Sequence, residues 1–193
     1  MVSNDLVDTV LENNSTMSVL LALAAQEGWR VHHMDVKSAF LNGDLKEEVY
    51  MWQPPGFAVP GEERKVYRLR KALYGLRQAP RAWNAKLGAT LKEMGFQQSA
   101  HEAAMYRRGS GRSVLLVGVY VDDLVIAGAD AEVEFKAAMK QRFDMSDLGL
   151  LSFYLGIEVR QSASGISLSQ AHYAKRILEL GDMVGCNSVH TPM

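Results

Sequence analysis

The chain has 193 residues, 48% of them hydrophobic and 22% charged, and its formal net charge is −1. This composition is typical of a globular protein and excludes an intrinsically disordered chain. The single cysteine, Cys186, excludes an internal disulfide and fits a reducing compartment. Since no apolar run approaches the roughly 18 residues that a membrane-spanning helix needs, we expect a soluble, cytoplasmic protein with no membrane partner.

The beginning of the chain predicts a helix followed by a strand. Residues 1–16 are polar and acidic, and we expect a disordered leader there. The apolar run from Met17 predicts a buried helix, and Gly28 suits the position just past its end. Residues 29–36 alternate between apolar and polar side chains, which predicts a short strand with Asp35 near its end.

The middle of the chain predicts strands around one amphipathic helix. Residues 38–51 favour a turn and a short helix, and residues 65–70 alternate as a strand with one basic face. Pro80 suits the first turn of a helix. The apolar residues of that helix recur at spacings of 4, 4 and 3, at Trp83, Leu87, Leu91 and Met94. Residues 104–108 and 113–121 are predicted to be strands.

The last third predicts a helix, a hairpin and a second helix. The first of these helices has an inward face formed by Phe135, Met139 and Phe143. Strands at 151–159 and 165–168 are expected to pair as a hairpin. Ser169 is expected to cap a final helix whose inward residues are Tyr173, Ile177 and Leu180. The order of elements predicts an α+β fold of the ferredoxin-like kind, an antiparallel sheet backed by two helices.

A basic stripe runs through residues 64–86. This segment contains eight basic residues and no acidic one: Arg64, Lys65, Arg68, Arg70, Lys71, Arg77, Arg81 and Lys86. Aromatic residues lie between them, so the stripe could follow a phosphate backbone while the rings stack on bases. A solvated helix face, with arginine stems covering apolar surface, explains the same residues equally well.

Two adjacent aspartates, Asp122 and Asp123, interrupt the most apolar stretch of the chain. Carboxylates beside a buried hairpin must be paired, solvated or bound to a cation, and no Lys or Arg lies between Arg112 and Lys136. Mg²⁺ prefers such oxygen ligands, although aspartates also occur simply as turn residues. Asp35 on another strand would complete the three carboxylates that two-metal phosphoryl transfer needs. The five histidines, which include His33, show no metal-binding spacing and are expected to be solvated or capping residues.

Five segments of the sequence carry a resemblance to one family. They are Asp-Val-Lys-Ser-Ala-Phe-Leu-Asn-Gly-Asp-Leu at 35–45, Gln-Pro-Pro-Gly-Phe at 53–57, Leu-Tyr-Gly-Leu-Arg-Gln-Ala-Pro-Arg-Ala-Trp at 73–83, Tyr-Val-Asp-Asp at 120–123 and Phe-Tyr-Leu-Gly-Ile-Glu-Val at 153–159. In this order they resemble the reverse transcriptase of copia-type LTR retrotransposons. The resemblance covers roughly residues 17–193.

The resemblance implies a polymerase palm with partial fingers over residues 17–160 and the start of a thumb or connection over 161–193. It implies RNA-directed DNA polymerase activity, with a primed RNA or DNA template and a deoxynucleoside triphosphate as partners. The family's basic, triphosphate-binding fingers segment and its ribonuclease H domain are not found in the sequence. A second chain that supplies them is therefore one expected partner. A retrotransposon particle in the cytoplasm is the expected location, with the nucleus as the alternative.

The resemblance also assigns roles to residues. It implies that Asp35, Asp122 and Asp123 are catalytic and bind two Mg²⁺ or Mn²⁺ ions, with the carbonyl of Val36 as a further ligand. Phe40 resembles the aromatic gate that excludes the 2′-hydroxyl, although a buried core Phe is the alternative reading of its sequence context. The remaining residues expected to bind the nucleotide are Tyr74, Gly75 and Gln78, and those expected at the primer or template are Tyr120, Arg77, Pro80 and Arg81.

Two other functions are compatible with the same residues. The first is a catalytically inactive, transposon-derived palm that retains its fold and at most binds nucleic acid. The second, from the fold alone, is a ferredoxin-like RNA-binding module that stacks bases on sheet aromatics. The second is disfavoured because carboxylates would stand where such a module needs aromatics.

Overall fold

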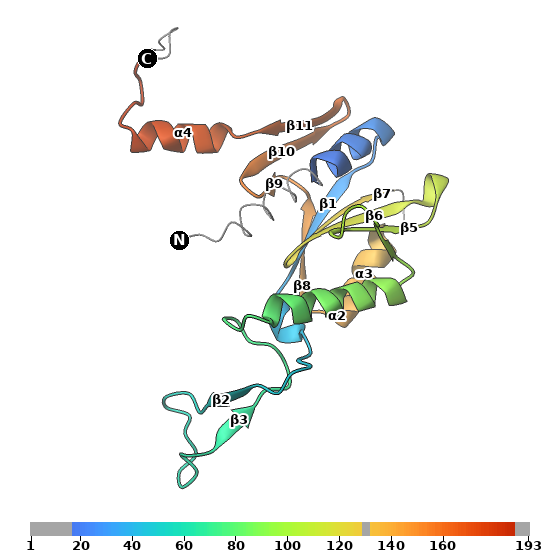
Figure 1. The fold of residues 1–193 in the computed structure, drawn as a ribbon. Helices are drawn as coiled ribbons and strands as arrows, with labels where there is room; N and C mark the ends of the chain where they lie inside the picture. The colour runs from blue at the N-terminus through green and yellow to red at the C-terminus, as the bar shows by residue number, and fades with distance from the viewer. Residues whose placement is uncertain (1–16, 129–131, 188–193) are drawn as a thin grey trace.

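The computed structural model describes residues 17–128 and 132–187 (Figure 1). A helix over residues 17–27, the N-terminal helix, comes first. The elements that follow are β1 (Val31–Val36), η1 (Ala39–Asn42), β2 (Tyr50–Trp52), β3 (Val66–Arg68), α2 (Ala79–Glu93), β4 (Gln97–Gln98), β5 (Met105–Arg108), η2 (Gly111–Ser113), β6 (Leu115–Tyr120), β7 (Asp123–Gly128), α3 (Glu132–Arg142), β8 (Met145–Leu150), β9 (Phe153–Tyr154), β10 (Ile157–Ser162), β11 (Gly165–Ser169) and α4 (Ala171–Leu180). Within these ranges no helix is both long and apolar enough to cross a membrane.

Six antiparallel strands form the main sheet, in the order β4-β5-β6-β7-β1-β8. β6 and β7 are rich in Val, Leu and Ile and are joined by a tight turn, which is the hairpin that their sequence predicts. β1 lies between β7 and β8, although it is the first strand in the sequence and they come much later. This arrangement puts the C-terminal end of β1 beside the β6–β7 turn.

Helices cover both faces of the sheet. α2 and α3 pack on one face, where Trp83 and Phe135 join Leu124 in one hydrophobic core. The N-terminal helix packs on the other face, where Leu20 joins Val125 in a second core. Successive side chains of a strand point to opposite faces, so β7 contributes to both cores and reads as an unbroken apolar run.

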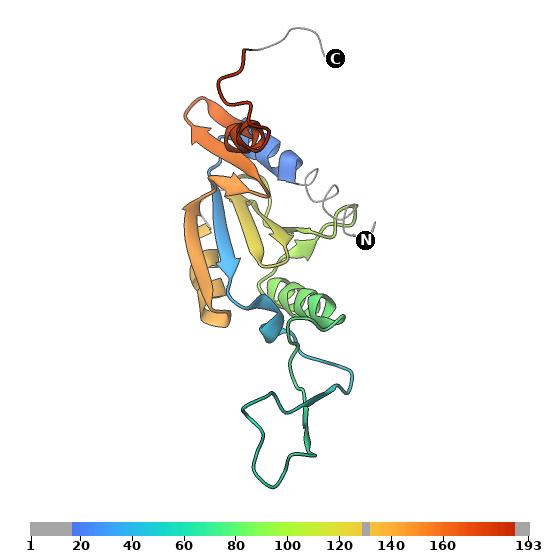
Figure 2. The same ribbon diagram turned by 90° about the vertical axis from the view of Figure 1, so that its left-hand side faces the viewer.

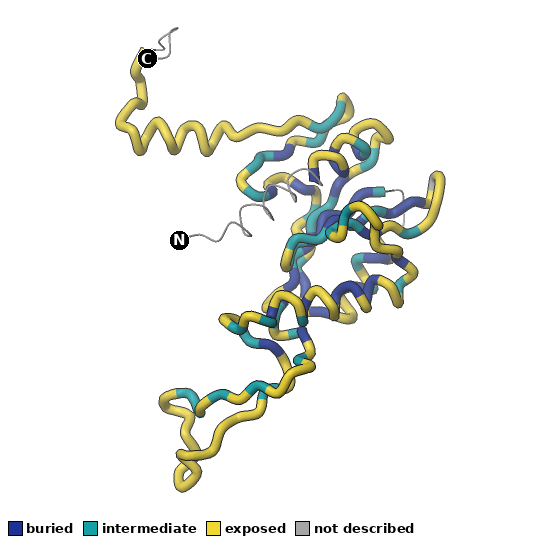
Figure 3. Tube along the Cα trace, viewed as in Figure 1, coloured by how far each residue is buried: buried dark blue, intermediate teal, exposed yellow. Residues whose placement is uncertain are grey.

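Two regions project from this body. β2 and β3 form an arm, residues 44–71, that extends away from the sheet beyond η1 (Figures 1 and 2). At the opposite end, β9, β10 and β11 form a separate three-stranded sheet that leads into α4. Most of the arm and all of α4 are exposed (Figure 3).

Much of the predicted element order is confirmed. The fold is α+β with an antiparallel sheet, and two helices, α2 and α3, back one face of it. α2 has proline in its first turn, buries Trp83, Leu87 and Leu91, and is followed by Gly95 at φ +85°. Phe135 and Met139 of α3 are also buried, as is Phe143, which directly follows the last residue of that helix.

Other expectations are wrong. Strand β2 lies where residues 38–51 favour a short helix, and helical structure there is limited to the 3₁₀ turn η1. No pattern predicts β8, which forms because β1 offers it an unpaired edge. The expected strand at 151–159 is broken into β9 and β10 by a turn at Leu155 and Gly156, which have φ of 45° and 85°.

The C-terminal helix differs in two ways from its prediction. Ser169 belongs to β11 and its hydroxyl donates to Glu158, while Gln170 occupies the N-cap of α4 without a side-chain hydrogen bond. No residue of α4 is buried, so the expected inward face has no partner in the part of the chain that the structure describes. The expected leader, residues 1–16, lies outside the described residues.

Candidate active site

The register of β1 against β7 brings two of the predicted carboxylates together. Asp35 near the end of β1 pairs directly with Asp123 at the start of β7. Directly opposed residues of an antiparallel pair share one face, with Cβ atoms about 4.5–5.5 Å apart. The backbone continues this contact, because the amide of Val36 donates to the carbonyl of Asp122 at 2.9 Å. All three aspartates are half-buried.

The turn that carries Asp122 is strained, and a hydrogen bond from helix α2 holds it in place. Val121 and Asp122 separate Tyr120 from Asp123, the last pair of the β6–β7 ladder. Val121 has a φ of 53°, a left-handed conformation that costs a β-branched residue about 1–3 kcal/mol. The indole Nε1 of buried Trp83 donates to the carbonyl of Val121 at 2.5 Å. The core helix α2 therefore fixes the turn beside which the carboxylates lie.

The surroundings of Asp122 disfavour its charged form. Burial raises the pKa of Asp122, the negative charges of Asp123 and Asp35 raise it further, and a backbone hydrogen bond opposes them. The charges of both neighbouring aspartates thus act in the same direction as burial, against ionisation of Asp122. A divalent cation between them would remove this repulsion.

Asp123 has a partner that the sequence interpretation missed. Nε2 of His33 lies 2.7 Å from Oδ1 of Asp123, and the His33 side chain is 13% exposed. The expectation that His33 is a solvated or capping residue is therefore wrong. The signal was available, because residues 33 and 35 lie on one face of any strand that contains both.

Tyr154 of β9 was missed as well. Its ring meets the rings of His33 and Tyr120 edge-on, with centroids 6.4 Å apart in each case. Burial raises the pKa of Tyr154, and the charge of Asp123 and the neighbouring Tyr120 raise it further. Its hydroxyl thus stays protonated beside the carboxylates. Only the folding of β9 over β1 and β6 reveals this proximity.

The three carboxylates are suitable ligands for a divalent cation, but in this structure they do not converge on one binding point. Across residues 17–128 and 132–187, no three His, Cys, Asp or Glu side chains converge on a point where an ion could bind. One oxygen of Asp123 is instead engaged by His33. Oxygen-only donors with mutual repulsion are the ligands that Mg²⁺ and Mn²⁺ prefer, so the residues fit such an ion in type and register.

A cavity of about 290 Å³ next to the turn collects several other predicted residues. Phe40, Pro80 and Tyr120 line it together with Trp83 and Val121. Phe40 is half-buried at its edge, so the alternative of a fully buried core Phe is not what the structure shows. The cavity reaches the β6–β7 turn through Tyr120 and Val121, and none of the three aspartates lines it.

The residues of the 73–83 segment are only partly brought to this cavity. Tyr74 is exposed and packs on Phe40, with ring centroids 4.8 Å apart, and Gly75 has a φ of 91°. Gln78 occupies the N-cap of α2 without a side-chain hydrogen bond to the helix. Arg77 and Arg81 are exposed at the start of α2 and do not line the cavity.

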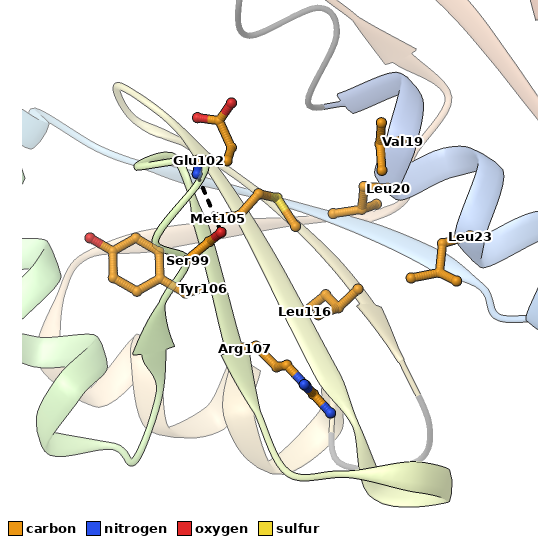
Figure 4. A pocket seen from close by; sticks show the side chains of 9 residues that line it. All are labelled: Val19, Leu20, Leu23, Ser99, Glu102, Met105, Tyr106, Arg107 and Leu116. Carbon is orange, nitrogen blue, oxygen red and sulfur yellow. Dashed lines mark hydrogen bonds between the residues drawn. The ribbon is translucent and has the colours of Figure 1, made fainter.

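A second cavity, of about 380 Å³, lies away from the carboxylates (Figure 4). It separates the N-terminal helix from β5 and β6, with Leu20 and Leu23 facing Met105 and Leu116 across it. None of the residues predicted to be functional lines it. Its lining is mostly apolar and includes a single carboxylate, Glu102, so it lacks the group of carboxylates that the predicted chemistry requires.

Comparison with known proteins agrees with the resemblance. A family model described as reverse transcriptase (RNA-dependent DNA polymerase) matches residues 4–193. The chain is 38% identical to the Retrovirus-related Pol polyprotein from transposon RE2 of Arabidopsis thaliana over 182 residues, 93% of this chain and 12% of that protein. It is 37% identical to the Pol polyprotein from transposon TNT 1-94 of Nicotiana tabacum, again over 93% of this chain but 14% of that protein.

A shorter relative is the putative transposon Ty5-1 protein of Saccharomyces cerevisiae, which is 34% identical over 83% of this chain and 53% of its own length. The chain thus spans about an eighth of the plant polyproteins that it matches, 12–14% of their length. The resemblance to copia-type retrotransposons is confirmed. This chain belongs to the reverse transcriptase (RNA-dependent DNA polymerase) family.

Proposed function

We propose that this chain carries the catalytic centre of an RNA-directed DNA polymerase, which adds deoxynucleotides to a primer 3′-hydroxyl by two-metal nucleotidyl transfer. The observation that carries the proposal is the pairing of Asp35 with Asp123, with Asp122 on the adjoining turn. Phosphoryl transfer depends on positioning and electrostatics, which carboxylates that hold divalent cations would supply, so no nucleophilic side chain is needed.

The topology supports a ferredoxin-like palm. Four neighbouring strands of the main sheet run in the order β6-β7-β1-β8, with β8 at the edge. α2 lies in the chain between β1 and β6, and α3 connects β7 to β8, with both helices on the same face. The opposite face carries the carboxylates, since Asp35 and Asp123 alternate with Met34 and Leu124 of the helix-covered core. In this assignment the palm and partial fingers span residues 17–160 and the start of the thumb spans 161–193.

Asp35 and Asp122 would hold two divalent cations, with Asp123 as the third carboxylate and the carbonyl of Val36 as a further ligand. When bound, these cations would lower the pKa of the primer hydroxyl and neutralise charge on the triphosphate and the departing pyrophosphate. The strained turn and its hydrogen bond to Trp83 hold Asp122 in place before any substrate arrives. Such preorganisation is how a protein contributes to this reaction.

The incoming nucleotide would lie at the β6–β7 turn, between the carboxylates and the residues at the edge of the 290 Å³ cavity. Phe40, held by its contact with Tyr74, would press on the sugar and exclude a 2′-hydroxyl. Gly75 and Gln78 would contact the nucleotide from the same segment, and Tyr120 and Pro80 would face the primer terminus. Arg77, just before α2, and Arg81, in its first turn, are exposed and would contact template phosphates.

The partners in this proposal are a primed RNA or DNA template, a deoxynucleoside triphosphate and a second chain that supplies further polymerase or ribonuclease H segments. The location that fits is a retrotransposon particle in the cytoplasm. One observation favours a second function, an inactive palm that only binds nucleic acid. In this structure no three carboxylates converge within the described residues, and Asp123 is turned to His33.

Primer extension separates the two functions. The wild-type chain is expected to extend oligo(dT) on poly(rA) with Mg²⁺ or Mn²⁺, and the double variant Asp122→Asn, Asp123→Asn is expected to bind the template without extending. Asp182→Asn is the matched control, because Asp182 is exposed and its φ of 52° suits asparagine. Template binding by the wild-type chain without any extension would contradict the polymerase and support the inactive palm.

A further inference from the structure

His33 and Asp35 project from the same face of β1. They are two residues apart on the strand, and Asp123 lies opposite Asp35 on β7. His33 itself pairs with Val125, so Asp123 is its diagonal neighbour, within reach of a long side chain. The imidazole uses that reach, since its Nε2 lies 2.7 Å from Oδ1 of Asp123. An ionised carboxylate can only accept, so Nε2–H is the donor.

Tyr154 restricts the imidazole from the other side. The two rings meet edge-on at 77°, and Tyr154 meets Tyr120 in the same way at 73°. Tyr154 is 5% exposed, and it comes from β9, far along the chain from β1. The enclosed imidazole therefore has little freedom to leave Asp123. Tyr120, at the end of β6 beside the turn, completes this aromatic support.

We propose that His33 is a positioning residue that fixes the orientation of the Asp123 carboxylate, and that Tyr154 in turn fixes His33. This inference rests on the proposed function, in which Asp123 is a ligand of a divalent cation. With Oδ1 occupied by His33, only Oδ2 of Asp123 remains fully available to a cation. Hydrogen bonds of this kind to a ligating carboxylate typically change metal affinity by about 10–100-fold.

The test is Mn²⁺ binding by the full chain, measured without substrate by the loss of the free-ion EPR signal. His33→Leu keeps the side-chain bulk but removes the donor, and it is expected to weaken Mn²⁺ binding by about 10–100-fold. His33→Gln offers an amide donor and is expected to restore most of that loss. Tyr154→Phe keeps the ring contact and is expected to have a smaller effect than His33→Leu. His101→Leu, at an exposed histidine, is the control.

A double-variant measurement separates positioning from a loss of stability. In an Asp123→Asn background, His33→Leu is expected to cause no further change in Mn²⁺ affinity, because the group it positions is already altered. Wild-type affinity in a folded His33→Leu, or an equal loss in both backgrounds, would overturn this inference alone. Absence of Mn²⁺ binding by the wild-type chain would instead overturn the proposed function, and this inference with it.

Discussion

The main sheet differs from the arm and α4 in how far it buries apolar side chains. In the sheet, β7 buries Leu124, Val125, Ile126 and Ala127 completely, because helices cover both faces. In the arm, Trp52 is 72% exposed and Phe57 is 75% exposed, and in α4 Leu180 is 79% exposed. The candidate site belongs to the first kind of structure. The carboxylates therefore lie on a sheet with a buried core, whereas the arm and α4 leave large apolar side chains exposed.

The largest expected difference in the free energy of unfolding is between alanine variants of two tryptophans, Trp83 and Trp52. Trp83→Ala is expected to lower the free energy of unfolding by about 3–5 kcal/mol, because it empties a buried site and removes the hydrogen bond to Val121. Trp52→Ala in the arm is expected to change it by about 0.5 kcal/mol or less. Urea unfolding followed by far-UV circular dichroism measures both. Equal losses in the two variants would show that the arm is part of the folded body.

Asp122→Asn is expected to stabilise the chain at neutral pH when divalent cations are absent. The folded-state pKa of Asp122 lies above its ordinary value of 3.8. The protonated side chain therefore favours the folded state fully below pH 3.8, and this stabilisation is lost as the pH rises through the folded-state pKa. The advantage of the variant should therefore appear as the pH is raised above about 4 and reach a plateau. Thermal unfolding in EDTA from pH 3.5 to 7.5 measures it.

Divalent cations should make the wild-type chain more stable than Asp122→Asn. Mn²⁺ is expected to raise the melting temperature of the wild-type chain and leave that of Asp122→Asn nearly unchanged, because a ligand that binds only the folded state stabilises it. Asp182→Asn is the control and should respond as the wild type does. If Mn²⁺ raised the melting temperature of Asp122→Asn as much as that of the wild type, the cation would bind at a site that does not include Asp122.

The smallest effect is expected in α4. Ile177→Ser is expected to change the free energy of unfolding by about 0.5 kcal/mol or less, because the side chain is 50% exposed and the helix buries no residue. The same urea titration measures it. A loss above about 2 kcal/mol, typical of a buried aliphatic residue, would mean that α4 packs on the body in solution.

The sequence predicts the parts of this structure that local patterns determine. The helical spacing of Trp83, Leu87 and Leu91 predicts α2, and the β-branched runs around Asp122 predict the β6–β7 hairpin. β8 could not be predicted, because Met-Ser-Asp-Leu-Gly-Leu has no clear alternation and is a strand only by pairing with β1. The exposed face of α4 reads as amphipathic from its sequence, yet sequence says nothing of what covers it.

The same division holds at the site. The three aspartates could be named from their motifs, and the β1–β7 register brings Asp35 opposite Asp123 as expected. The orientation of Asp123 could not be named, because it depends on a hydrogen bond from His33 and on Tyr154, which only tertiary folding brings to β1. The sequence could thus predict which residues form the candidate site, but it could not predict the contacts that orient their side chains.

Anomalous diffraction from crystals of the chain soaked in MnCl₂ would locate bound cations relative to the three aspartates. We expect Mn²⁺ peaks bound jointly by carboxylate oxygens of Asp35 and Asp122, on the sheet face opposite α2 and α3. Mn²⁺ found only at unrelated surface carboxylates, with Asp35 turned away from the β6–β7 turn, would contradict it.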